Sequence, residues 1–316
     1  MTKMKTEILR PDRLGISRAA DLLCAGQLVA FPTETVYGLG ADAHNDKAVA
    51  RIFEAKDRPQ FNPLIVHVSG MNTAQEIAEF NDTAERLAAT FWPGPMTLVL
   101  PLKSGAGISP LVSAGLDTIA IRIPAHPLAH ELLTQFNGPI AAPSANRSGK
   151  ISPTTADHVM SGLNGRIAAI LDGGPCEVGL ESTIIGFDPE PTLLRPGGLP
   201  VEAIERCLGQ PLAEPSHSET PTAPGQLASH YAPNAAIRLN VNSVNPDETL
   251  LGFGHVECDL NLSAGGDLVE AAANLFHALR ELDAQGVKKI AVSLIPDHGL
   301  GRAINDRLKR AAAPRT

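Results

Sequence analysis

The chain has few aromatic residues and no long apolar segment, and these two absences exclude several classes of protein. Its 316 residues include one Trp, two Tyr and nine Phe, which leaves few platforms on which the bases of a single strand could stack. No apolar run approaches the roughly 20 residues that a membrane-spanning helix needs. The first seven residues also lack the apolar region of a secretory signal. We therefore expect a protein that is neither secreted nor inserted in a membrane.

Cysteine is also scarce, and the four cysteines are scattered at Cys24, Cys176, Cys207 and Cys258. None of them forms a Cys-x-x-Cys pair, the spacing that zinc sites usually show. Isolated thiols without a disulfide framework are typical of reduced, cytosolic proteins. The sequence thus predicts a cytoplasmic protein with no metal ion held by its own side chains.

Positive charge is not in excess, since the formal net charge at pH 7 is −8. A protein that wraps nucleic acid over much of its surface needs a positive potential there, so that function is disfavoured, although a local basic groove stays open. The P-loop pattern G-x-x-x-x-G-K-S/T is absent as well. A bound nucleotide would therefore need a different set of phosphate donors.

The length of the chain and a proline-rich stretch together predict two domains. A sequence of 316 residues is long for a single domain. Residues 210–225 contain four prolines and no apolar periodicity, which is typical of a linker. We predict a front domain over residues 1–209, a proline-rich linker over 210–235 and a small domain over 236–316.

The front domain is predicted to combine many short strands with helices. Apolar runs and alternation predict strands over residues 28–31, 63–68, 96–102, 118–123, 139–142, 168–171, 182–187 and 192–195. A helix is predicted over 46–56, because Asn45 or Asp46 can cap its start and Pro59 prevents a long extension. A second helix is predicted to begin with Ser152 as its N-cap and Pro153 at its first position. The strand content is too high for a simple repeat of βαβ units and predicts an α/β or α+β sheet domain.

The small domain shows a simpler alternation. Strands are predicted over 249–253 and 289–295, and helices over 268–284 and 300–312. This order is that of a βαβ-type unit and predicts a parallel sheet. The domain has no G-x-G-x-x-G motif and no evident acid–base cluster, which favours a role in regulation or closure over one in chemistry.

Two cations, Lys56 and Arg58, are expected at the end of the first helix, directly before a predicted strand. Cations at a helix C-terminus can simply offset the helix dipole and face water. A Lys beside the planar fork of an Arg can equally bind phosphate oxygens, with Asn62 at the mouth of the sheet. The residues alone leave both interpretations open.

A hydroxyl–amide pair, Ser144 and Asn146, follows the apolar strand predicted at 139–142. Such residues are common in surface turns because they satisfy the turn backbone themselves. The free N–H groups of a helix beginning at Ser152 could instead join this loop in binding an anion. Here too the residues favour neither interpretation.

Arg122 lies in a sharply alternating strand, on the face opposite its isoleucines. Its guanidinium would either meet solvent at a sheet edge or hold a carboxylate, such as that of an amino acid, inside a cavity. His67 lies in another predicted strand, where a lone His is more often structural. Thr35, Ser182 and Arg195 adjoin strands, and each alone fits either an ordinary turn or a polar pocket.

Six motifs that are ordinary singly occur together in a fixed order. They are Pro32-Thr-Glu-Thr-Val-Tyr-Gly-Leu39, Lys56-Asp-Arg-Pro59, Phe91-Trp-Pro-Gly-Pro-Met-Thr97, Ala142-Pro-Ser-Ala-Asn-Arg-Ser-Gly149, Glu181-Ser-Thr-Ile184 and Leu194-Arg-Pro-Gly197. From Gly26 to about Cys207 the chain resembles the YrdC-like family. The segment Pro224-Gly-Gln-Leu-Ala-Ser-His-Tyr-Ala-Pro233 is similar to the linker of its long, two-domain members, the threonylcarbamoyl-AMP synthases.

The resemblance implies a YrdC-like twisted mixed sheet followed by a small Rossmann-like α/β domain. It implies an enzyme that joins L-threonine, bicarbonate and ATP, with Mg²⁺ accompanying the ATP, into threonylcarbamoyl-adenylate and releases pyrophosphate. That product serves the modification of an adenosine beside the anticodon of tRNA. Hand-over to the tRNA threonylcarbamoyl-transfer machinery is therefore expected, and weak RNA binding stays open.

Roles for single residues are implied only where the motifs match. Lys56 and Arg58 would be catalytic and would hold the triphosphate and the carboxylated intermediate. ATP contacts are implied for Arg58, Asn62, Thr118, Ser144, Asn146, Ser152, Arg195 and Tyr231. Threonine contacts are implied for Thr35, His67, Arg122, Ala142 and Ser182, with Arg122 as the carboxylate fork. We further expect the linker around His230 and Tyr231 to close over the unstable product as a lid.

Three rival functions differ in what the sequence should contain. An RNA-binding module without nucleotidyl transfer would want more positive charge and more aromatic residues. The carbamoyl transferases of hydrogenase maturation look similar but carry Cys-x-x-Cys zinc pairs, which this chain lacks. A sugar-phosphate lyase of related fold would want a cluster of acidic metal ligands, and none is evident.

Overall fold

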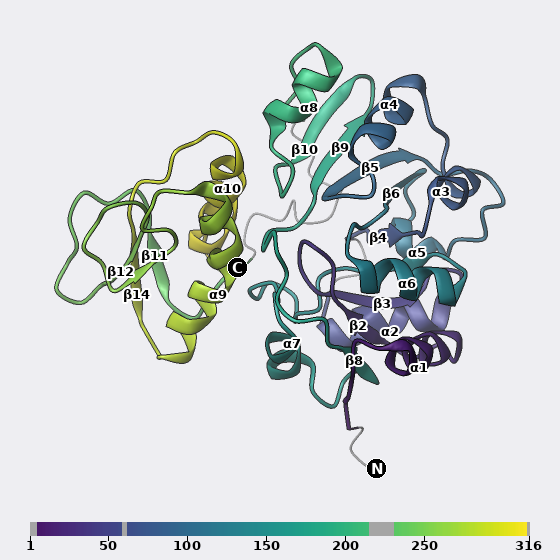
Figure 1. Ribbon diagram of the computed structural model, residues 1–316, viewed down its shortest axis with the longest axis horizontal. Coiled ribbons are helices and arrows are strands. Elements are labelled where there is room, and N and C mark those ends of the chain that lie inside the picture. Colours follow the sequence, from purple (N-terminus) through teal and green to yellow (C-terminus); the bar gives the residue numbers. More distant parts are fainter. Residues whose placement is uncertain (1–4, 59–61, 215–230, 315–316) are drawn as a thin grey trace.

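The computed structural model describes residues 5–58, 62–214 and 231–314, which form two sheets with their own helices (Figure 1). The larger sheet has the strand order β1-β8-β2-β3-β7-β4-β6-β5-β9-β10. Its strands are β1 (Glu7–Leu9), β2 (Val29–Phe31), β3 (Gly38–Asp42), β4 (Ile65–His67), β5 (Met96–Pro101), β6 (Thr118–Arg122), β7 (Ile140–Ala141), β8 (Ala169–Leu171), β9 (Thr183–Phe187) and β10 (Pro191–Arg195). The sheet contains both parallel pairs, such as β4 with β6, and antiparallel pairs, such as β5 with β6. The predicted mixed sheet is therefore confirmed.

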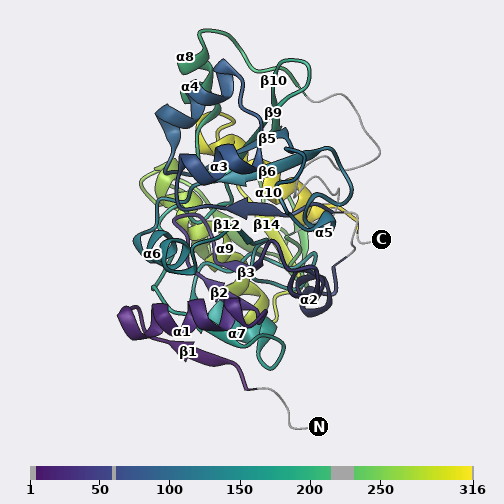
Figure 2. The ribbon, with the colours of Figure 1, turned by 90° about the vertical axis from the view of Figure 1, so that its right-hand side faces the viewer.

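Eight helices accompany this sheet in the described residues. They are α1 (Arg13–Cys24), α2 (Asp46–Lys56), α3 (Met71–Ile77), α4 (Asp82–Phe91), α5 (Pro110–Ser113), α6 (Pro127–Phe136), α7 (Ala156–Leu163) and α8 (Val201–Leu208). In both Figure 1 and Figure 2, α4 and α8 lie side by side at one end of the larger domain. Local sequence explains α2 well. Asn45 caps it, Val49, Ile52 and Phe53 are buried, and the left-handed Asp57 ends it.

The N-cap of α2 offers a test of its contribution to stability. The Asn45 side chain accepts hydrogen bonds from the backbone N–H groups of Lys47 and Ala48. Asn45→Ala removes both acceptors and should lower the free energy of unfolding by about 1 kcal/mol. Urea unfolding of this variant measures the effect, with Lys47→Ala, an exposed position on the same turn, as control. Equal stabilities of the two variants would contradict the assigned cap.

The second predicted helix start is wrong. Helix α7 begins at Ala156, and Thr155, not Ser152, is its N-cap, accepting from the N–H of His158. Ser152 is fully buried and donates its hydroxyl to Glu181, at 2.5 Å. Ser152 instead lies in the loop before this helix, where its hydroxyl donates to a carboxylate from a distant part of the chain, and the later Thr155 caps the helix.

The smaller sheet is parallel throughout, in the order β11-β14-β12-β13. It consists of β11 (Ala236–Arg238), β12 (Thr249–Gly252), β13 (Leu260–Asn261) and β14 (Lys289–Val292). The predicted parallel βαβ unit is confirmed by β12, α9 (Leu268–Ala284) and β14. Figure 1 shows α9 and α10 (Leu300–Ala312) on the side of this sheet that faces the larger domain.

Apolar residues of both domains share one buried cluster. Phe276 and Leu279 of α9 belong to it together with Val36, Ile151 and Leu180 of the larger domain. Burial of apolar surface is the main stabilising contribution to such contacts. The smaller domain is therefore packed against the larger one over a common core.

Edge strand β10 is covered by the segment that follows α8. The N–H of Leu193 donates to the carbonyl of Ala213 at 2.9 Å, and the N–H of Ala213 donates to the carbonyl of Pro191 at 3.0 Å. The start of the predicted linker thus pairs with the sheet. Residues 215–230 of that linker lie outside the described residues. Within the described ranges, no helix combines the length and apolar character needed to cross a bilayer.

Candidate active site

The strand register of the larger sheet brings the predicted polar residues to one edge. His67 and Arg122 are paired residues at the ends of the parallel strands β4 and β6. Strand β5 runs antiparallel to β6 and parallel to β9, so β5 and β9 begin where β4 and β6 end. Ser182 directly precedes β9, and Arg195 ends the antiparallel β10 at the same edge. Distant parts of the chain are thereby gathered in one place.

A cavity of about 50 Å³ lies at this edge. Nine of the predicted site residues line it: Thr35, Arg58, His67, Arg122, Ala142, Ser144, Ser182, Arg195 and Tyr231. Three of them are buried arginines, which gives the cavity a positive character. Such a site suits a ligand that carries carboxylate or phosphate groups.

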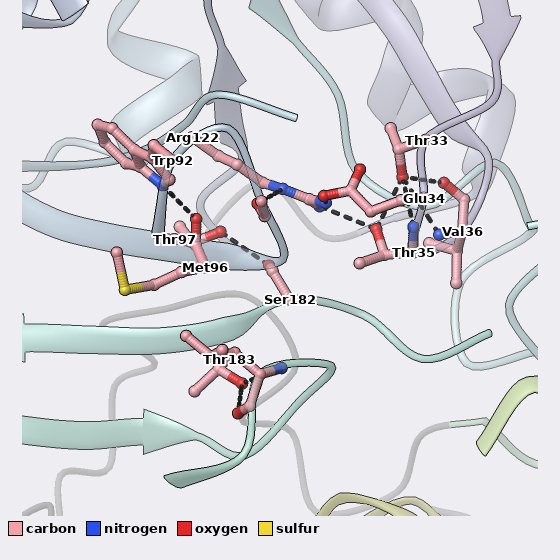
Figure 3. A network of polar contacts seen from close by, with 12 residues as sticks. Thr33, Glu34, Thr35, Val36, Trp92, Met96, Thr97, Arg122, Ser182 and Thr183 are labelled. Atoms are coloured by element: carbon pink, nitrogen blue, oxygen red, sulfur yellow. Dashed lines mark hydrogen bonds and ion pairs between the residues drawn. The ribbon is translucent and has the colours of Figure 1, made fainter. Parts of the chain in front are cut away.

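Arg122 is held from three sides (Figure 3). Its Nη1 donates to Thr35 Oγ1 at 2.8 Å, its Nε donates to the carbonyl of Gly94 at 3.1 Å, and its Nη2 lies 2.6 Å from Glu34 Oε1. Both partners of this ion pair are buried, with 3% and 9% of their side chains exposed. The fork predicted to take a carboxylate thus already faces one.

Glu34 is a functional candidate that the sequence interpretation missed. Its carboxylate is within reach of the predicted threonine fork, and the available signal was its place inside the first motif. Thr33, its neighbour, accepts from the N–H groups of Thr35 and Val36 and so fixes the turn. The turn after β2 therefore presents one carboxylate and one hydroxyl to Arg122.

Ser182 is fixed by both of its own polar groups. Its hydroxyl lies 2.7 Å from Thr97 Oγ1, and its carbonyl accepts from Nε and Nη2 of Arg195 at 3.2 and 2.9 Å. Glu181, its neighbour, is buried and lines the cavity. Burial alone would raise the pKa of Glu181, but the charges of Arg307 and Arg195 hold that pKa below its usual value. Glu181 is therefore an ionised wall residue.

Lys56 directs its ammonium group at the loop that carries Ser144 and Asn146. Its Nζ donates to the carbonyl of Ser144 at 2.5 Å and to that of Asn146. Burial, with a smaller effect from Arg58, lowers the pKa of Lys56 well below its ordinary value. In this arrangement Lys56 acts first as an anchor for the loop, and its predicted contact with phosphate stays a prediction.

Arg58 reaches the cavity and keeps a spare donor. Its Nη2 donates to the carbonyls of Asn62 and Pro63, whereas its Nε has no hydrogen-bond partner among the described residues. Burial lowers its pKa to about 10, so the group remains charged at neutral pH. An unpaired buried N–H is costly, and a ligand oxygen would satisfy it.

Five predicted residues do not line this cavity: Lys56, Asn62, Thr118, Asn146 and Ser152. Thr118 begins β6, about 13 Å of strand away from Arg122 at the rise of a β-strand. Asn62 is buried beside Arg58 without lining the cavity. Asn146 instead lines a second cavity of about 560 Å³ between the domains, whose wall includes Lys150, His158 and Arg280. Ser152 does not line the first cavity either, but its hydroxyl reaches the wall through Glu181.

His67 is buried and uncharged. Burial, together with the nearby charge of Arg122, lowers its pKa to about 3. Its Nδ1 has no hydrogen-bond partner among the described residues. The imidazole can therefore accept or donate a hydrogen bond to a ligand without carrying charge at neutral pH.

His67 should make the protein less stable in acid. Because its folded-state pKa of about 3 lies below the ordinary value of 6.5, protons bind the unfolded chain more readily. This contribution to the free energy of unfolding is complete above pH 6.5 and falls by up to about 1.4 kcal/mol per pH unit toward pH 3. Urea unfolding from pH 7 to 4.5 should show a weaker pH dependence for His67→Gln than for the unchanged protein. The exposed His130→Gln is the control, and parallel curves for all three would contradict the assignment.

The described residues offer no set of side chains that could enclose a metal ion at this site. Among the described residues, no group of three or more His, Cys, Asp or Glu side chains is placed to hold one. A cation at this site would have to be bound mainly through its ligand's own oxygens.

Known proteins match both parts of the chain. A family model described as "Telomere recombination" matches residues 21–197, and one described as "Threonylcarbamoyl-AMP synthase, C-terminal domain" matches residues 199–313. The threonylcarbamoyl-AMP synthase of Pyrococcus abyssi is 43% identical over 94% of this chain and 94% of its own length. That of Bacillus subtilis is 44% identical, over 95% and 93% respectively. A crystal structure of P. abyssi Sua5 complexed with L-threonine has a TM-score of 0.89 at 41% identity and covers 97% of both chains.

Proposed function

The chain belongs to the threonylcarbamoyl-AMP synthase family, and from this premise we propose that its buried cavity binds L-threonine beside ATP and joins them with bicarbonate. The chain is thus an enzyme of the adenylate-transferring kind, which synthesises L-threonylcarbamoyl-adenylate. The resemblance found in the sequence and the predicted fold are both confirmed. Support for the proposed site comes above all from the convergence of Arg58, Arg122 and Arg195 on one cavity.

Threonine would occupy the part of the cavity nearest Arg122. The guanidinium fork is the natural partner of its carboxylate, with Thr35, His67 and Ser182 around the remaining polar groups. Glu34 already pairs with Arg122, so its carboxylate would either share the fork or turn toward the ammonium group of threonine. With its carboxylate at Arg122 and its ammonium group at Glu34, zwitterionic threonine would be held in one orientation.

ATP would lie with its triphosphate against Arg58 and the loop of Ser144 and Asn146. That loop is anchored by Lys56, and Arg195 lines the same cavity. A free volume of about 50 Å³ holds only a few water molecules, so this cavity alone would not contain both substrates. Mg²⁺ fits here as a companion of the triphosphate, because it is commonly bound through substrate phosphates and water rather than by a protein cage.

The proposed chemistry needs orientation more than acid–base catalysis. Bicarbonate would carboxylate the neutral threonine amine with loss of one water molecule, and a carbamate oxygen would then attack the α-phosphorus of ATP while pyrophosphate leaves. The arginines would hold the reacting oxygens in line and stabilise the charge that develops on the phosphates. Bound Mg²⁺ would supply further charge neutralisation. A closed cavity would also protect the labile carbamate from water.

Pyrophosphate release tests the proposed function. Release from ATP and Mg²⁺ should require both L-threonine and bicarbonate, and omission of either should reduce it to background. Pyrophosphate release that does not depend on threonine would overturn the proposal. Salt-dependent binding of tRNA without any turnover would then favour the rival RNA-binding module, which the net charge of −8 otherwise disfavours. We also expect a cytoplasmic protein that passes its product to the tRNA threonylcarbamoyl-transfer machinery.

A further inference from the structure

Arg307, on α10 of the smaller domain, is completely buried against the wall of the cavity in the larger domain. Its Nε donates to Glu181 Oε2 at 2.8 Å, and its Nη1 donates to the carbonyl of Pro196 at 2.9 Å. Nη1 also donates to the neighbouring Asp306. A buried charge of this kind is tolerated only where it is paired and hydrogen-bonded. The smaller domain thus places a fully buried cation against two groups at the edge of the candidate active site.

Glu181 connects Arg307 to the residues of the site. Its other oxygen, Oε1, accepts the hydroxyl of Ser152 at 2.5 Å. The next residue, Ser182, lines the cavity and is held by Thr97 and Arg195. One carboxylate therefore ties together two loops that come from different parts of the chain, and Arg307 fixes that carboxylate.

Tyr231 is held from the same side. The guanidinium carbon of Arg307 lies 5.2 Å from the centroid of the Tyr231 ring, within range of a cation–π contact. The ring also stacks on Phe276 of α9, with 5.5 Å between centroids. Because Tyr231 lines the cavity, two helices of the smaller domain determine where one of its walls stands.

We propose that Arg307 is a positioning residue of the synthase, through which the smaller domain sets the affinity of the larger domain for L-threonine. This inference rests on the proposed function. Arg307 acts on Glu181, and Glu181 holds the peptide of Ser182 in the geometry that receives the amino acid. The planar fork of an arginine can serve Glu181, Pro196 and Asp306 at once, which the single ammonium group of a lysine cannot do.

The first test replaces Arg307 with lysine in the full-length protein. Arg307→Lys should raise the Kd for L-threonine, measured by calorimetry, at least tenfold, and should raise the KM for threonine more than it changes kcat. The control is Arg302→Lys, on the same helix. Arg302 also faces the larger domain, 3.8 Å from Glu202, but it is 42% exposed and away from the cavity. The threonine affinity of Arg302→Lys should stay within twofold of that of the unchanged protein.

A double-mutant cycle separates positioning from simple stabilisation. Glu181→Gln should weaken threonine binding about as much as Arg307→Lys, and the double variant should be no weaker than either single variant. Threonine affinity that is unchanged in folded Arg307→Lys, or losses that add in the double variant, would overturn the inference. If Arg307→Lys does not fold, Glu181→Gln provides the test, because it leaves α10 intact. Unchanged threonine affinity in folded Glu181→Gln would then overturn the inference.

The failure of the underlying function would look different. An unchanged protein that binds no threonine at all would sink the proposed function itself. An unchanged protein that binds threonine, together with equal losses in Arg307→Lys and Arg302→Lys, would leave the function standing. It would show that any contact between the domains has the same effect, and the specific role of Arg307 would be lost.

Discussion

Arg58→Ala should lower kcat/KM for threonine-dependent pyrophosphate release about 100- to 1,000-fold, the usual cost of removing one preorganised donor to a developing charge. Arg58 is buried, remains charged at neutral pH, and carries a donor that no described residue satisfies. A group of this kind contributes most when phosphate charge builds up in a site that excludes water. The measurement is a coupled pyrophosphate assay at saturating and at limiting ATP.

The control for this variant is Arg166→Ala. Arg166 lies close by, since it pairs with Asp57, but its side chain is 37% exposed and does not line the cavity. The change in net charge is the same in both variants. A comparable loss in Arg166→Ala would show that general electrostatics, rather than a phosphate contact by Arg58, explains the effect.

Arg122→Lys should raise the KM for L-threonine at least about 30-fold, equivalent to about 2 kcal/mol, the lower end of the cost of disrupting a buried hydrogen-bonded charge. Lysine keeps the charge but cannot contact Gly94, Thr35 and Glu34 together, nor present a fork to a carboxylate. The KM for ATP should change far less. Steady-state kinetics with each substrate varied measures the two constants.

Two further results would qualify or contradict the role of Arg122. Arg18→Lys, an exposed position paired with Glu7, should leave both constants unchanged. A rise in the KM for ATP equal to that for threonine would contradict a specific carboxylate fork. Thermal unfolding of Arg122→Lys should accompany the kinetics, because Glu34 is left with a weaker partner in a buried place.

Local patterns in the sequence predicted what local interactions determine. The helix over 46–56 was found with those bounds because its cap, its apolar face and its end signal all lie within a few residues. The alternating segment at 118–123 likewise appears as β6. Ser152 shows the limit. Its hydroxyl serves a carboxylate from another part of the chain, and no local rule contains that partner.

The site itself was reached through motifs, and its missing members are those whose partners are distant. Glu34 carries a role only because β6 brings Arg122 to it. Arg307 stands in a helix without any chemical signature, and its partner Glu181 belongs to the other domain. Sequence patterns can indicate that such residues are polar. They cannot show which buried charge each will meet, because that follows from the packing of whole domains.

The pairing of Ala213 with β10 has a practical consequence for dissecting the protein. A shortened chain ending at residue 209 would strip that cover and present the backbone N–H and C=O groups of an edge strand to other molecules. Uncovered edges of this kind promote aggregation. Light scattering should therefore reveal self-association in such a fragment, and less of it in one ending at Glu214. Weak activity of a fragment that ends at residue 209 would then reflect aggregation as much as the absence of the smaller domain.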